Sequence, residues 1–459
     1  MLETRIRDLL CAARDSARRR QIMAEFNFHR ERSSLIRLGN SAVALSTHEE
    51  LTRLDIHVQQ GRRTGTASLL ADITGREQLE AVLNQALENC RAALEKEYDP
   101  IFGVVEETVD DTHGYDSALE NLSPATKTEL CAQVITTLKP RGRYDFSGSW
   151  SSGSVELYYI TTANDNECYR RLTDSKLMLV LKEQDKKWEL SVERTAKRAG
   201  EFTAQDIIAE FEELLPIYEK NPGFRTAVGR QRVLFGPGAL AALAQLTVWS
   251  GLIGRFWEEG RAFTSGKQFG DRLFSEQITI ADDPANPQVF GMPFDFSGKR
   301  RRRFVLVEKG TFTGLAYDTA TAAKYQKQPT GHDLENWDLT LAPGTAPAGI
   351  AQARKLAGDA LYIPHLHYIH LPDPTKGLFT GSSRFNALRI TKGEFTAPLF
   401  SSRITDTLPT VLSNVVAVSA RTVAQNESAT YGRRLPEGLS VPEYMICDAV
   451  RISDVADSF

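Results

Sequence analysis

The segment from Leu240 to Gly270 constrains the fold of this chain more than any other. It reads LAALAQLTVWSGLIGRFWEEGRAFTSGKQFG, which predicts a helix, an EEGR turn and an SGKxxG loop. The acidic turn DDPANP follows at 282–287, and the pattern from Arg230 onward is mostly strands and hairpins. We therefore expect an α+β protein, with a mixed sheet in an α/β front half and a β-rich C-terminal half.

The 459 residues exceed the size of one ordinary core, and three domains are predicted, over 1–100, 101–225 and 226–459. The first has a helix to about residue 25, strands over 34–45 and 54–69, and a second helix behind a capping box at Thr74–Glu77. In the second, an acidic, turn-rich stretch over 100–125 is interpreted as a linker. The elements expected after it are a helix over 127–138, strands over 144–162 and 176–196, and a helix over 203–220.

Two hairpins are expected in the third domain, over 304–315 and 388–399. Both contain the pattern x-K-G-x-F-T at the turn. The shared pattern suggests repeated strand pairs within one sheet system.

Composition excludes several classes of function. The formal net charge is −4, so nothing global favours nucleic acid or an anionic membrane, and no apolar run approaches the ~20 residues that span a bilayer. The N-terminal stretch is charged throughout, unlike a secretory signal. The 5 cysteines are scattered and lack metal-type spacing, which fits reduced thiols. A cytoplasmic location is therefore expected.

The order of helix, turns and loop from Leu240, with TGSSRF from Thr380 and ITKGEF from Ile390, resembles the TldD/PmbA family. Its two subunit types were called modulators of DNA gyrase and are regarded as a metalloprotease pair. In the catalytic subunit this helix carries His-Glu-x-x-x-His. Such a zinc site needs two imidazoles one helical turn apart and a carboxylate that acts as general base.

Counted back from the SGK loop, the three motif positions fall on Gln245, Leu246 and Ser250, which cannot do that work. The family's third ligand is a cysteine, and the nearest one here, Cys447, lies in the apolar run YMICDAV. The resemblance therefore implies a TldE/PmbA-like subunit with no catalytic residues and no cofactor of its own. Zinc is expected in a catalytic partner subunit.

The resemblance also suggests residues that border a peptide cleft. In the family the loop of Ser265, Gly266 and Lys267 follows the active-site helix and borders that cleft. Gly381 and Arg384 match a T-G-x-x-R element, in which the arginine could bind peptide or form a structural ion pair.

Two charged clusters have alternative interpretations. His365, His367 and His370 form HLHYIH, a weak candidate for a metal site, because in an unbroken strand His370 would face away from the other two. The run KRRRR over 299–303 can mark nucleic-acid contact. A charged hairpin or partner-facing edge is preferred, because nearby aspartates (Asp282, Asp283 and Asp295) can offset part of the charge.

The first functional hypothesis is a non-metal subunit of a TldD/PmbA-type peptidase acting on unfolded or extended peptides. It would form a heterodimer with a TldD-like, zinc-bearing homologue, and edge strands would bind peptide backbone. The alternative is a catalytically inactive homodimer that binds a peptide or a partner. A third hypothesis, an independent enzyme using the histidine cluster, requires metal in the isolated chain. No membrane partner is expected, and the preferred interpretation of the basic run argues against nucleic acid.

Overall fold

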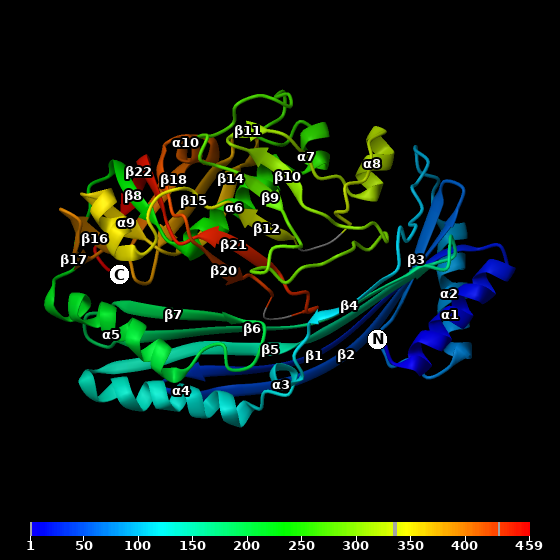
Figure 1. Ribbon diagram of the computed structural model, residues 1–459, viewed down its shortest axis with the longest axis horizontal. Helices are drawn as coiled ribbons and strands as arrows, with labels where there is room; N and C mark the ends of the chain where they lie inside the picture. The colour runs from blue at the N-terminus through cyan, green and yellow to red at the C-terminus, as the bar shows by residue number, and fades with distance from the viewer. Residues whose placement is uncertain (1, 334–336, 430–431) are drawn as a thin grey trace.

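The computed structural model describes residues 2–333, 337–429 and 432–459. Its N-terminal half is built on one seven-stranded sheet (Figure 1). The strands are β1 (Met23–Gly39), β2 (Ala42–Gln60), β3 (Arg63–Leu69), β4 (Val109–Gly114), β5 (Tyr144–Thr161), β6 (Glu167–Glu183) and β7 (Glu189–Ala196). They lie in the order β3-β2-β1-β5-β6-β4, with β7 also paired to β6.

Alternation along the strands gives this sheet two buried faces. On β5, Tyr158 and Ile160 pack toward helices, whereas Leu157 and Tyr159 face the other way and contact the C-terminal half. The helices of the first face are α1 (Thr4–Arg19), α2 (Arg76–Ala92), α4 (Pro124–Leu138) and α5 (Ala204–Lys220). Figure 1 shows the C-terminal half lying across the opposite face.

Several predictions for this half need correction. β1 belongs to the first predicted domain, 1–100, and β5 to the second, 101–225. The two strands pair with each other, so both segments share one sheet. The interpretation of 100–125 as a linker was wrong, since it contains β4, parallel to β6, and α3 (Ser117–Glu120). β4 reads VDDTHG and is held by polar contacts, including an ion pair between Asp111 and Arg170 at 2.7 Å. Because its residues are mostly polar, β4 lacks the alternation of apolar and polar side chains that predicts a strand.

The predicted capping box is also absent. Helix α2 has Gly75 at its N-cap without a side-chain cap. The backbone N–H of Thr74 donates to Gln78 at 2.9 Å, and Glu77 plays no part in that contact.

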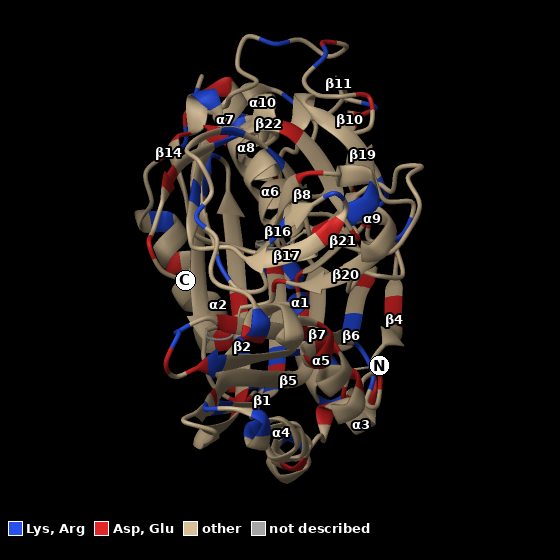
Figure 2. Ribbon diagram, turned by 90° about the vertical axis from the view of Figure 1, so that its left-hand side faces the viewer, with Lys and Arg blue, Asp and Glu red and all other residues tan. Residues whose placement is uncertain are grey.

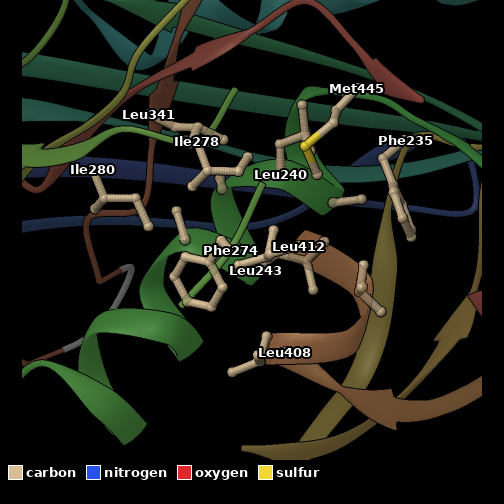
Figure 3. Close-up of a cluster of buried hydrophobic side chains, with 14 of the residues drawn as sticks. Phe235, Leu240, Leu243, Phe274, Ile278, Ile280, Leu341, Leu408, Leu412 and Met445 are labelled. Atoms are coloured by element: carbon tan, nitrogen blue, oxygen red, sulfur yellow. The ribbon is translucent and has the colours of Figure 1, made fainter. Parts of the chain in front are cut away.

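The C-terminal half places two sheets around one helix, α6 (Pro237–Gly251). The six-stranded sheet contains β9 (Ile280–Asp282), β10 (Phe304–Glu308), β11 (Thr311–Phe312), β12 (Asp338–Leu341), β20 (Thr422–Asn426) and β21 (Gly438–Pro442). The nine-stranded sheet contains β8 (Gly229–Phe235), β13 (Ala360–Ile363), β14 (Leu366–Asp373), β15 (Leu378–Ser383), β16 (Leu388–Thr391), β17 (Glu394–Pro398), β18 (Ser402–Thr407), β19 (Val415–Val418) and β22 (Met445–Val455). Figure 3 shows Leu240 and Leu243 of α6 among side chains from both sheets.

Short helices complete the chain: α7 (Gly254–Glu258), α8 (Thr319–Tyr325), α9 (Ile350–Ala357) and α10 (Leu408–Ser413). The predicted α+β class is confirmed, and each of the three sheets combines antiparallel pairs with a parallel one: β4–β6, β12–β21 and β8–β13. None of the helices in the described ranges combines the length and apolar character that a membrane crossing requires.

The two x-K-G-x-F-T hairpins form as predicted, but they do not share a sheet. β10–β11 belongs to the six-stranded sheet and β16–β17 to the nine-stranded one. Both turns place Lys and then Gly at positive φ, 45° and 73° at 309–310 and 52° and 79° at 392–393. The shared pattern therefore specifies a tight turn, which favours glycine, and not membership of one sheet.

A buried ion network joins β9 and β12, two neighbouring strands of the six-stranded sheet. Arg301 donates to both oxygens of Asp282 on β9, at 2.6 and 2.7 Å, and to Asp338 on β12 at 3.1 Å. Asp338 also accepts backbone N–H groups from Gly291 and Met292. The central arginine of KRRRR is thus a structural cation.

We expect Arg301→Leu to lower the free energy of unfolding by about 3–5 kcal/mol, because it leaves two buried carboxylates without their cation. Arg303→Leu is the matched control, since Arg303 is exposed and its pair with Asp283 at 3.4 Å is on the surface. Denaturant midpoints would measure both, and equal losses for the two variants would contradict the assignment.

Candidate functional site

A cavity of about 420 Å³ lies against α6, at the positions where the resemblance places the lost motif. Gln245, Leu246 and Trp249 line it from the helix. The other walls are mostly apolar side chains of Trp337, Leu339, Leu366 and Ile369, with one carboxyl group, that of Glu437. The cavity thus has the general character of a ligand site, apolar with few polar groups.

The polar end of this cavity is a hydrogen bond between α6 and the start of β21. Nε2 of Gln245 donates to Oε1 of Glu437 at 3.3 Å. Burial raises the pKa of Glu437 to about 7. The Gln245 hydrogen bond opposes that shift, and the nearby charge of Glu427 adds to it.

The donor atoms at these positions do not fit a zinc ion. The Gln245 amide is engaged with Glu437, Leu246 is apolar, and Oγ of Ser250 donates to the carbonyl of Leu246 at 2.6 Å. Cys447 is fully buried in β22, where it pairs with Val233 and Val415. Among the residues that the structure describes, no three His, Cys, Asp or Glu side chains are grouped as a metal site. The expected zinc in a partner subunit stays a prediction.

Glu437 reaches α6 because the connection between β20 and β21 is anchored on the N-terminal sheet. Arg434 donates to Asp174 on β6 at 2.7 Å and to Ser151 on β5 at 3.0 Å. Asn426, at the end of β20, donates to Asp174 at 3.1 Å. The sequence interpretation missed Glu437. Its one available signal was a carboxylate between Pro436 and Gly438, directly before a strand.

Further charged groups of the N-terminal sheet approach this connection and the residue that precedes β14. Lys176 of β6 lies 3.6 Å from the carboxylate of Glu427, whose pKa is raised by burial. On β7, Glu193 lies 3.8 Å from Nδ1 of His365. The surroundings of the cavity therefore combine residues from both halves of the chain.

The predicted cleft residues of the SGK loop lie outside this cavity. Ser265, Gly266 and Lys267 form a surface turn after α7, and Gly266 has a φ of 84°. Oγ of Ser265 accepts from the backbone N–H of Ala262 at 3.2 Å, which closes the turn locally. Their role in substrate contact stays a prediction.

Gly381 and Arg384 have structural contacts. Gly381 lies on β15, where an added Cβ would stand 2.8 Å from Cγ1 of Ile369, a cavity residue. Arg384 donates from Nε and from a terminal nitrogen to Glu189 of β7, at 3.1 and 2.9 Å. Of the two alternatives for Arg384, the structure shows the ion pair. This ion pair links the two halves of the chain.

Two of the three clustered histidines contact the same aromatic ring, that of Phe385. A bulge at Tyr368, with a φ of 50°, breaks β14 between His367 and His370. The rings of His365 and His367 lie 6.4 and 5.1 Å from that of Phe385, between ring centroids, whereas His370 is exposed. The break that a three-histidine site would need is present, but the three side chains do not converge.

Comparison with known families and curated proteins locates the similarity. Residues 228–454 match the family described as PmbA/TldA metallopeptidase C-terminal domain. A stretch of 74 residues is 35% identical to a metalloprotease of Methanothermobacter thermautotrophicus. That stretch covers only 16% of this chain and 16% of its relative.

Solved structures share the whole architecture at low identity. A proposed modulator of a DNA gyrase from Thermotoga maritima superposes with a TM-score of 0.82 at 16% identity, over 97% of this chain and 99% of that one. TldE from Thermococcus kodakarensis gives 0.80 at 17%, over 94% and 97%. A proposed modulator of DNA gyrase from Bacteroides thetaiotaomicron gives 0.78 at 16%, over 99% and 100%. At such identities these likenesses show the fold.

We expect Glu437→Gln to remove a pH-dependent loss of stability. A carboxyl whose pKa rises from 4.5 unfolded to about 7 folded holds its proton more tightly in the native state, so stability falls as pH rises between those values. The variant should be more stable than the wild type at pH 8, by on the order of 1–3 kcal/mol, and the two should converge near pH 4. Unfolding midpoints across this range measure the difference, and a constant offset at all pH values would refute the expectation.

Proposed function

We propose, from the premise that this chain belongs to the TldD/PmbA family through its C-terminal domain, that it is the non-metal subunit of a peptidase complex. Its substrates would be unfolded or extended peptides. Its partner would be a TldD-like homologue that carries zinc. In this proposal the partner supplies the hydrolytic chemistry and this chain supplies part of the peptide-binding surface.

The cavity at α6 carries the proposal. Where a zinc subunit needs two imidazoles and a carboxylate, this chain has Gln245, Leu246 and Ser250, and the cavity that Gln245 and Leu246 line is largely apolar. An apolar cavity with one hydrogen-bonded carboxyl suits the binding of a side chain. It offers no general base paired with an activated nucleophile.

The adjoining strand supports an extended ligand. Within the described ranges, β14 is a terminal strand of the nine-stranded sheet and pairs with β15 alone. Leu366 and Ile369 of β14 line the α6 cavity. A peptide added along this edge would be held by main-chain hydrogen bonds, and one of its side chains could enter the cavity.

The first test is isolation of the chain from its native cells, with identification of the proteins that accompany it. The proposal expects a homologue with His-Glu-x-x-x-His, zinc in the complex, and peptidase activity only when both chains are present. Activity of the partner alone equal to that of the mixture would contradict the proposed role.

Leu246→Arg should reduce peptidase activity of the reconstituted complex by about tenfold or more without loss of zinc, because it fills the cavity with a charged side chain. Leu356→Arg is the matched control, since Leu356 is 49% exposed on α9. Trp249→Ala is a second variant, which enlarges the cavity. Trp249 is 52% exposed, so a change in activity in this variant does not depend on placing a charge at a less exposed position. Unchanged activity in both Leu246→Arg and Trp249→Ala would refute a role for the cavity.

The alternative is a catalytically inactive homodimer that binds peptide without cutting it. The same donor set favours it, because a cavity that does not fit zinc can still bind a side chain. A chain that purifies as a dimer of itself, binds peptide, and gains no activity from any zinc-bearing homologue would support this reading.

A further inference from the structure

A large cavity lies between the two halves of the chain, and the function proposed above does not use it. Its volume is about 840 Å³, within the range of about 300–1,000 Å³ that is common for ligand pockets. One wall comes from β4, β6 and the segment that follows β7, and the other from residues 284–303, which include most of the KRRRR run. We call it the basic cleft.

Cations outnumber anions in its lining. Seven of its residues are Arg or Lys, and three are Asp or Glu. The cations are Arg170, Lys197, Arg198, Arg300, Arg301, Arg302 and Arg303, and the anions are Glu107, Asp111 and Glu201. Figure 2 shows charges of both signs interspersed over both halves of the molecule, so this excess is local.

Several of these cations are already neutralised. Arg170 pairs with Asp111 at 2.7 Å and Arg300 pairs with Glu107 at 3.1 Å. Arg301 and Arg303 are paired in the aspartate contacts described above. Glu201 accepts the backbone N–H of Lys197 at 2.8 Å, so its carboxylate is also engaged.

Three cations remain without a carboxylate within ion-pair distance in the described parts of the chain: Lys197, Arg198 and Arg302. The ammonium of Lys197 donates to carbonyl oxygens, that of Pro287 at 2.6 Å and that of Val289. Arg198 makes one long contact, 3.4 Å, with the carbonyl of His113. Arg302 is exposed.

The back of the basic cleft also has spare donors. Arg170 and Arg301 are each more than nine-tenths buried, at 4% and 3% exposure, and the Nε of each has no hydrogen-bond acceptor. Burial lowers the pKa of Arg170, against the effect of Asp111. Both side chains are already paired with carboxylates, so these spare donors add hydrogen-bonding capacity, and no net positive charge, to the back of the cleft.

The lining favours carboxylates of a peptide over a nucleic acid strand. Single-stranded nucleic acid binds where bases stack on exposed aromatic rings along a basic groove. Among the described lining residues, Phe290 is the one phenyl, phenol or indole ring, and it is 4% exposed with the Lys197 ammonium 5.6 Å from its centroid. Apart from the exposed imidazole of His113, no ring of the described lining is therefore free to stack a base.

We propose that the basic cleft binds an acidic segment of a peptide, whose carboxylates contact Lys197, Arg198 and Arg302. This inference rests on the proposed function for the identity of the ligand as a peptide. It extends that function by giving the complex a preference for substrates with Asp or Glu away from the α6 cavity.

The test uses the full chain alone, without a zinc partner. Fluorescence anisotropy at low salt would follow a fluorescein-labelled dodecapeptide of alternating Glu and Ala, and the same peptide with Gln in place of Glu. The wild type should bind the Glu peptide at least about tenfold more tightly than the Gln peptide. The double variant Arg198→Gln/Arg302→Gln should lose most of that preference. It leaves Lys197 and its loop contacts in place.

The matched control is Arg91→Gln/Lys355→Gln, which removes the same charge from exposed positions on α2 and α9, outside the basic cleft. It should bind the Glu peptide as the wild type does. Equal affinity of the wild type for both peptides, or equal losses in the two double variants, would overturn the proposal. So would tighter binding of a labelled oligothymidylate that depends on Arg198 and Arg302.

Because this binding requires no partner and no hydrolysis, it can fail while the complex still forms and cuts peptides. It can also succeed if no zinc-bearing homologue is found. The two proposals therefore have separate outcomes.

Discussion

The buried contact between Arg434 and Asp174 joins the two halves of this molecule at the connection that leads to the α6 cavity. The side chains are 5% and 1% exposed, so breaking the pair would leave a charge in the interior. Arg434 belongs to the connection between β20 and β21, and Asp174 to the N-terminal sheet. The pair fixes that connection on the sheet, and Glu437, three residues further on, then reaches Gln245 on α6. The chemical character of the cavity thus depends on a contact made outside it.

Much of the architecture could be predicted from local pattern. The turns after β1 and β2, the helix of 204–220 and the Lys-Gly hairpins depend on short-range chemistry, and they were found. The single N-terminal sheet was not. β1 carries His29 and Glu31 at fully buried positions, and their partners Arg433 and Arg434 lie more than 400 residues away along the chain. The pattern of β1 is therefore too polar to predict a core strand, because its buried polar groups are paired by residues from the far end of the chain.

The candidate site likewise contains residues that the sequence could place and residues that it could not. Gln245, Leu246 and Ser250 could be placed by counting along one helix, because their spacing is set by the helix itself. Glu437 and Glu427 come from a distant connection and enter through packing. The KRRRR run was predicted only in part. The expectation that Asp282 and Asp283 offset its charge is confirmed by their contacts with Arg301 and Arg303, but the cleft that the same run lines with β6 could not be read from the sequence.

The bulge at Tyr368 has a consequence for solubility. A terminal strand with free backbone groups can pair with the same strand of another molecule, and repeated pairing leads to aggregates. In β14 the positive φ of Tyr368 interrupts the regular ladder after His367, and the pairing with β15 resumes only at His370. A second long, flat strand could not follow this edge without meeting the break. The irregularity therefore limits indiscriminate self-association while leaving short stretches of backbone accessible.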